Sequence, residues 1–138
     1  RSGDTLVERL TAAGHILDAR TIIRDERADI GQQLRDWVAD TAIDVIISTG
    51  GTGLTGRDVT VEATRQVIER EMPGVAEAGR AYGQERTPYA MLSRGVAGVA
   101  GSTIIVNVPG SSRGADETMT AIFPGILHAY GMLQGKGH

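Results

Sequence analysis

The stretch that decides the fold is "DVIISTGGTGLTGRDVT", residues 44–60, in which a short apolar run leads into a loop crowded with glycine. Residues 44–49 predict a buried strand, and a helix is expected from about residue 61 to residue 72 with Thr60 as its N-cap. A connection from a strand to a helix is where α/β sheets bind ligands. The loop is therefore a candidate anion site, with a simple tight turn as the alternative.

The glycine loop matches neither of two common phosphate-binding patterns in full. Residues 51–56 read G-x-G-x-x-G, but a dinucleotide fold also needs an acidic residue about twenty positions later at the end of a strand, where a helix is expected here. The loop also has the P-loop spacing, with Arg57 in place of the lysine and Asp58 in place of the magnesium-binding hydroxyl.

The closing aspartate decides what the loop can bind. A carboxylate about 4 Å from a phosphate charge costs roughly 4 kcal/mol at an effective dielectric of 20. The attraction of a phosphate to a helix N-terminus is smaller than this cost. Phosphate binding therefore requires either that Asp58 points away or that a cation such as magnesium lies between the charges. The alternative is that Asp58 only helps to start the helix and that the glycines only permit positive φ. The loop by itself leaves both readings open.

The rest of the chain alternates helical periodicity with β-branched runs, which is typical of an α/β domain. We expect a three-layer sandwich in which a mostly parallel sheet is flanked by helices, built as one domain over residues 1–138. Pro124 should kink or split the last helix. The expected elements are a helix ending at Gly14, a strand at 15–24, a helix through Ile30–Val38, a helix after Pro73 and Gly74, a short helical piece near 91–94, a strand at 103–108 and a helix from Ala115 to Leu133.

A second glycine-containing loop, "NVPGSS" at residues 107–112, follows the predicted strand 103–108. Two loops of this kind can face one crevice, where backbone N–H groups at both helix starts converge on an anion. Asn107 and the serine hydroxyls would add neutral donors. The alternative is an ordinary turn whose helix is capped by Ser111 or Ser112.

Composition excludes several classes of protein. The net charge is -3 with scattered basic residues, so we expect no nucleic-acid partner, and no apolar run approaches the ~18 residues of a membrane span. The chain has no cysteine, so neither a disulfide nor a thiolate metal site is expected. Its three histidines lie too far apart in the sequence to suggest a local pair of metal ligands. A cytoplasmic location is expected.

Longer stretches of the chain resemble the MoaB/Mog family of molybdenum-cofactor biosynthesis, and the G domain of gephyrin is similar. The resemblance is carried by "RSG", "TGGTGLTGRDVTVEAT", "IEREMPG" and "TPYAMLSRGVAGVAGSTIIVNVPGS" and runs over essentially the whole chain. It implies an adenylyltransferase that uses Mg²⁺, ATP and molybdopterin and releases adenylyl-molybdopterin and pyrophosphate. It also implies a homotrimer, or a hexamer as in some members, and hand-over of the product to a molybdenum insertase.

The resemblance assigns roles to individual residues. Asp25 and Asp58 match two family aspartates implicated in catalysis through magnesium. Without the family, Asp25 is equally well read as a helix cap. The residues that match the family's nucleotide- and pterin-binding positions are Gly50, Gly51, Thr52, Gly53, Ser93, Asn107, Gly110 and Ser111. Arg57 is added as a nucleotide-binding candidate because its charge can offset that of a phosphate.

Two expectations concern what the sequence leaves open. Relatives begin with a strand ahead of "RSG", whereas this sequence starts at Arg1, so the first strand of the family's sheet is expected to be missing. A family member can also bind molybdopterin as a scaffold without adenylylating it. This second function is kept as the alternative to the enzyme.

Overall fold

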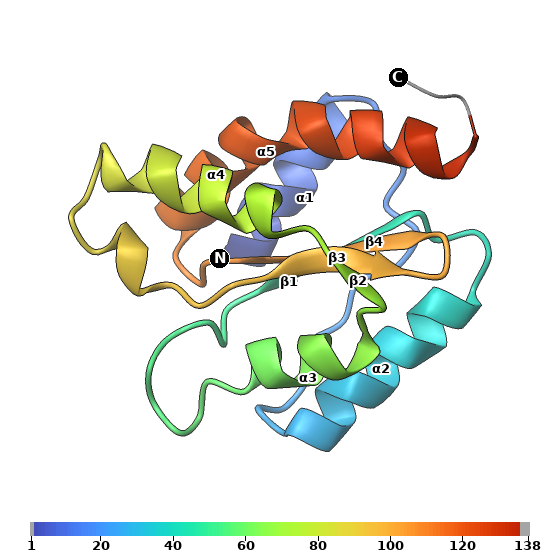
Figure 1. Ribbon diagram of the computed structural model, residues 1–138, viewed down its shortest axis with the longest axis horizontal. Coiled ribbons are helices and arrows are strands. Elements are labelled where there is room, and N and C mark those ends of the chain that lie inside the picture. Colours follow the sequence, from blue (N-terminus) through green and yellow to red (C-terminus); the bar gives the residue numbers. More distant parts are fainter. Residues whose placement is uncertain (1, 136–138) are drawn as a thin grey trace.

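A four-stranded sheet lies between two layers of helices in the computed structural model, which describes residues 2–135 (Figure 1). The sheet order is β1-β4-β3-β2. Its strands are β1 (Val45–Thr49), β2 (Arg70–Glu71), β3 (Ala97–Ala100) and β4 (Thr103–Val108).

The helices divide between the two faces of the sheet (Figure 1). One face carries α1 (Ser2–Ala12), α4 (Pro73–Gln84) and α5 (Ser112–Leu133), and the opposite face carries α2 (Arg27–Ala39) and α3 (Thr60–Val67). A short 3₁₀ turn, η1 (Ala90–Leu92), follows α4. The expected α/β sandwich is therefore confirmed.

The central strand β4 organises the core, because all six of its residues are buried. Ile104, Val106 and Val108 pack with α5 residues such as Met119, since alternate side chains of a strand point to the same face. Ile105 points to the other face and packs with Leu34 of α2 and its neighbours. This two-sided burial explains why the strand reads as one continuous apolar run.

The sheet is mixed and not mostly parallel in the part of the chain that the structure describes. β1 pairs with β4 in parallel, whereas β3 is antiparallel to both β4 and β2. The sequence did not predict β3 because its residues are small. The structure requires that smallness at Gly98, where a Cβ would lie 2.4 Å from Ile68 Cγ2 and 2.6 Å from the Arg70 carbonyl oxygen.

Two expectations about local structure are wrong, and of the two outcomes expected at Pro124, a kink or a split, the split does not occur. Residues 15–24 form no strand; Ile16 and Ile22 are 92% and 94% exposed, and no described strand pairs with this segment to complete a ladder. The helix α3 ends at Val67, ahead of β2. The last helix continues through Pro124 without splitting, because Met119, Ile122 and Ile126 bury its face on both sides of the proline.

Within residues 2–135, none of the helices combines the length and the apolar character needed to cross a membrane.

Candidate functional site

The two glycine-containing loops meet at the carboxyl ends of β1 and β4. Thr49 and Val108 are register partners at the ends of these parallel strands. The Gly50 N–H donates to the Val108 carbonyl at 3.1 Å, and the Thr49 hydroxyl donates to the Pro109 carbonyl at 3.0 Å. The backbones come so close that a Cβ on Gly110 would lie 3.2 Å from Gly50 Cα. The predicted convergence of the two loops is therefore present in the fold.

Glycine is required in the first loop for two separate reasons. Gly50 and Gly51 have φ of +89° and +71°, a region that side chains disfavour. A Cβ on Gly51 would also lie 1.9 Å from Thr60 Oγ1, at the start of α3. Thr60 is the first residue of that helix, and the N-cap position falls to Val59, one residue earlier than expected. Thr52 is buried, and Gly53 lies against the Asp58 carboxylate.

Asp58 closes the glycine loop through its side chain. Its Oδ2 accepts hydrogen bonds from the Thr55 N–H at 3.0 Å and from the Thr55 hydroxyl at 2.8 Å. These donors favour the ionised form, so they hold the pKa of the Asp58 carboxyl below its usual value. The carboxylate is therefore charged at neutral pH and is held against the loop.

Asp25 reaches the same loop from the start of α2. Its Oδ2 lies 4.0 Å from Nη2 of Arg57, and both side chains are exposed. The N-cap of α2 is Glu26, whose side chain makes no capping hydrogen bond. The geometry thus favours the loop-facing reading of Asp25 over the helix-cap reading.

The donor chemistry at this edge suits a magnesium ion that shares its shell with phosphate and water. Among the described residues, no three His, Cys, Asp or Glu side chains come close enough to form a metal site of their own. Magnesium usually takes only one or two protein carboxylates and completes its shell with water and substrate phosphates. Asp25 and Asp58 remain the residues predicted to hold it.

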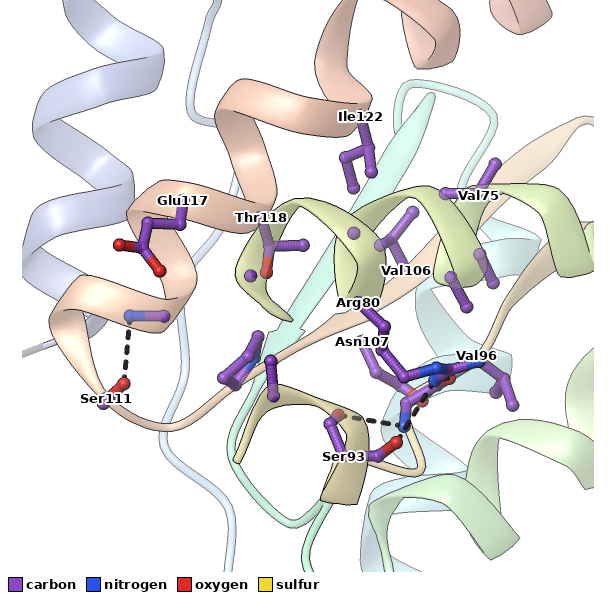
Figure 2. A pocket seen from close by; sticks show the side chains of 18 of the residues that line it. Val75, Arg80, Ser93, Val96, Val106, Asn107, Ser111, Glu117, Thr118 and Ile122 are labelled. Carbon is purple, nitrogen blue, oxygen red and sulfur yellow. Dashed lines mark hydrogen bonds between the residues drawn. The ribbon is translucent and has the colours of Figure 1, made fainter. Parts of the chain in front are cut away.

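A separate cavity of about 230 Å³ lies behind the second loop, between α4, α5 and the sheet (Figure 2). Ser93, Asn107 and Ser111 line it. Among the described residues, its lining contains neither the glycines of the first loop nor Asp25 or Asp58. The structure therefore divides the predicted site residues into two groups, which touch where the two loops meet.

The Asn107 side chain is fully engaged inside the protein. Its amide donates to Ser48 Oγ at 2.7 Å and to Thr64 Oγ1 at 3.1 Å, and its Oδ1 accepts from the Val96 N–H at 3.1 Å. This network joins β1, α3, β4 and the start of β3. Asn107 thus fixes the cavity wall, and its two amide hydrogens are already used.

The serines of the cavity are also engaged locally. Ser111 is the N-cap of α5 and accepts the Gly114 N–H at 3.0 Å, as one of the two predicted alternatives requires. Ser93 Oγ accepts the Gly95 N–H at 3.3 Å. A hydroxyl that accepts through a lone pair keeps its own hydrogen for another acceptor.

Two arginines of this region were not predicted from the sequence. Arg80 of α4 donates to the carbonyl oxygens of Ser93 and Gly95 at 3.3 and 2.8 Å (Figure 2). Arg94 donates to the glycine loop and pairs with Glu62 of α3, with Nη1 2.6 Å from Oε2. The only sequence signal for Arg94 is its place next to Ser93 in "MLSR", and Arg80 has no signal in the helical pattern.

The Glu62–Arg94 pair makes a prediction about pH. The guanidinium hydrogen bond holds the pKa of the Glu62 carboxyl below its usual value. Because the folded-state pKa is lowered, the pair stabilises the fold above the unfolded pKa of about 4.3, and this contribution is lost as the pH falls through the folded pKa. In Arg94→Gln, ¹³C NMR titration should show a higher Glu62 pKa. Arg65→Gln, which removes the partner of Glu71, is the control; an unchanged Glu62 pKa in Arg94→Gln would contradict the assignment.

A sheet covered on both faces, with two helix-starting loops meeting beside a cavity, defines an α/β ligand-binding domain. The family model described as "Probable molybdopterin binding domain" matches residues 1–128. The chain belongs to this family.

Relatives and solved structures agree with that assignment. The chain is 39% identical over 137 residues to the molybdenum cofactor biosynthesis bifunctional protein of Chlorobaculum tepidum, covering 99% of this chain and 44% of the relative. It is 35% identical over 115 residues to the molybdopterin adenylyltransferase of Helicobacter pylori strain J99, covering 83% of this chain and 65% of the relative. The crystal structure of the molybdopterin biosynthesis enzyme MoaB from Thermus thermophilus superposes with a TM-score of 0.90 at 43% identity, covering 99% of this chain and 86% of that one.

Proposed function

We propose that this domain acts in molybdenum cofactor biosynthesis and transfers the adenylyl group of ATP to molybdopterin, releasing pyrophosphate. The observation that carries the proposal is the meeting of the two loops at Gly50 and Gly110, beside a cavity, in a loop that Asp58 closes. Such an arrangement suits two anionic reactants that must be brought together. The name of the Helicobacter pylori relative, molybdopterin adenylyltransferase, supports the same reaction.

The reaction needs positioning more than covalent chemistry. An oxygen of the terminal phosphate of molybdopterin attacks the α-phosphorus of ATP, a new phosphorus–oxygen bond forms, and the bond to pyrophosphate breaks. Both reactants are anions, so the protein must align them and offset their charge. When bound, magnesium would supply positive charge at the phosphate oxygens.

The residues of the first loop take the nucleotide in this proposal. Backbone N–H groups of Gly51 and Thr52 offer donors to phosphate oxygens, as loops at helix starts commonly do. The other two glycines shape the loop, because the Gly50 N–H is bonded to the Val108 carbonyl and Gly53 lies against the Asp58 carboxylate. Arg57 is 88% exposed and only loosely paired with Asp25, so it is free to turn toward a phosphate. Asp25 and Asp58 are the catalytic aspartates and the candidate magnesium ligands.

The cavity takes part of the pterin substrate. Its volume of about 230 Å³ is below the roughly 300 Å³ at which pockets for whole drug-sized ligands begin. It therefore suits a ring system better than a complete phosphorylated molecule. Ser93 and Ser111 offer hydroxyl hydrogens there, Asn107 holds the wall, and Gly110 allows the second loop to approach the first.

The cellular setting is part of the same proposal. The domain would work in the cytoplasm as a homotrimer, or as a hexamer, and pass adenylyl-molybdopterin to a molybdenum insertase. The chain spans 44% of the bifunctional relative and 65% of the Helicobacter pylori relative. The activity of these longer proteins is therefore proposed for this chain and needs a direct test.

The direct test is pyrophosphate release from purified protein with magnesium ATP and molybdopterin. We expect release only when both substrates are present, together with an adenylylated pterin product in equal amount. Mixtures lacking either substrate are the controls. Pterin binding without pyrophosphate release would replace the enzyme with the scaffold function.

A further inference from the structure

One side chain ties the glycine loop to the segment that follows η1. Arg94 Nε donates to the Gly53 carbonyl at 2.7 Å, and its Nη2 donates to the Asp58 carbonyl at 3.0 Å. The Arg94 backbone N–H donates to the Thr52 carbonyl at 2.9 Å. The two ends of the predicted nucleotide loop are thus bonded to a single residue, next to Ser93 of the cavity.

The guanidinium is itself held in place from α3. Nη1 lies 2.6 Å from Glu62 Oε2, and Nη2 lies 3.4 Å from Glu62 Oε1. Glu62 is in the first turn of α3, the helix that the loop begins. The two side chains are 34% and 38% exposed, so water screens the attraction, and the geometric effect of the pair is larger than its energy.

The contacts determine which way the loop peptides face. The peptide groups are planar, and no cis bond occurs among the described residues, so each N–H points opposite to the carbonyl of the same plane. Holding the carbonyls of Gly53 and Asp58 toward Arg94 therefore turns the N–H groups of Leu54 and Val59 away from it. An anion-binding loop depends on such an arrangement of N–H groups.

We propose that Arg94 is a positioning residue that holds the glycine loop in its nucleotide-binding shape and fixes its distance from Ser93. The inference rests on the proposed function for its kinetic readout, but its structural readout is independent of any reaction. Arginine suits this role because its planar fork spreads the donors over three nitrogens that reach two carbonyls and a carboxylate, whereas the three donors of lysine share a single nitrogen.

The test compares Arg94→Gln, Arg94→Lys and Glu62→Gln with the control Arg65→Gln. Arg65 also pairs with a glutamate, Glu71, at 2.8 Å, but the bonds found for it do not reach the glycine loop. Hydrogen–deuterium exchange of residues 51–59 measures the loop shape without any ligand. Steady-state kinetics with magnesium ATP then separates KM from kcat.

We expect Arg94→Gln to speed exchange in residues 51–59 and to raise the KM for magnesium ATP roughly 10- to 100-fold, as the loss of charge-assisted hydrogen bonds implies. Exchange of β4 should stay unchanged. Arg94→Lys should recover only part of both effects, and Glu62→Gln should act in the same direction but less. Arg65→Gln should leave both readouts at the parental level.

The outcomes separate this inference from the proposed function. If the parental protein releases no pyrophosphate, faster loop exchange in Arg94→Gln still supports the positioning role, and the reaction alone is rejected. If exchange of residues 51–59 matches the parental protein in Arg94→Gln, the positioning role is overturned. It is also overturned if exchange rises equally in β4, because the residue would then only stabilise the fold.

Discussion

Asp58→Asn should reduce adenylyl transfer to below about 1% of the parental kcat/KM while the protein remains folded, a loss in the range seen when one charge-stabilising group is removed from an active site. The substitution removes the negative charge that the proposal requires for magnesium. It keeps the shape of the side chain and one carbonyl oxygen, which can still accept from Thr55. The free energy of unfolding should therefore change little.

Asp40→Asn is the matched control for Asp58→Asn. Asp40 also accepts a backbone N–H within a turn, from Ala42 at 2.9 Å, but it lies before β1, at the opposite end of that strand from the glycine loop. We expect parental turnover in this variant, measured as pyrophosphate release. Near-parental turnover in Asp58→Asn would defeat the assignment of Asp58 as a catalytic residue.

Gly51→Ala should disable the loop through its backbone. The residue has a φ of +71°, and the added Cβ would lie 1.9 Å from Thr60 Oγ1, so the loop or the start of α3 must move. Holding alanine in this conformation costs about 1 to 3 kcal/mol of stability. A displacement of about 1 Å in a positioning loop can lower turnover about 100-fold. Chemical denaturation and steady-state kinetics measure the two effects.

Gly56→Ala is the control for Gly51→Ala, because it adds the same methyl group to the same loop without a clash. Gly56 lies in the same loop, but a Cβ there would meet nothing within 4 Å, and its φ is not positive. This variant should fold as stably as the parent and keep its turnover. Equal losses in both variants would mean that neither glycine position tolerates a side chain, and the argument from Thr60 would fail.

The sequence was sufficient where local pattern and tertiary environment agree. The strand β4 is buried along its whole length because both faces of the sheet are covered, whereas β1, expected to be buried, lies at one end of the described sheet with Ile46 as its only buried residue. The two glycine loops follow these strands directly, as predicted. Residues 15–24 also have a strand-like pattern, but a ladder requires a partner, and no described strand pairs with them. Strand β3 was missed although it is present, because its sequence lacks a strand-like pattern. Gly98 is required there by the closeness of Ile68 and not by strand propensity.

The candidate site shows the same division. Asp58, the glycines and the second loop could be found from spacing along the chain, because each loop is local. The contacts of Arg94 join it to Gly53 and Glu62, which are distant in sequence, and no local pattern indicates them. The cavity likewise depends on how α4 packs against α5, which only the folded chain reveals.

The pairing of β1 with β4 has a consequence for the order in which the protein can mature. Gly50 is bonded to the Val108 carbonyl, and the two strands are separated in sequence by α3, α4 and the β2 and β3 strands. Contacts between distant segments form slowly because a long chain must close before they are made. During synthesis, the glycine loop can therefore adopt its shape only after β4 has left the ribosome. A truncated chain that ends before Thr103 should have no formed nucleotide loop.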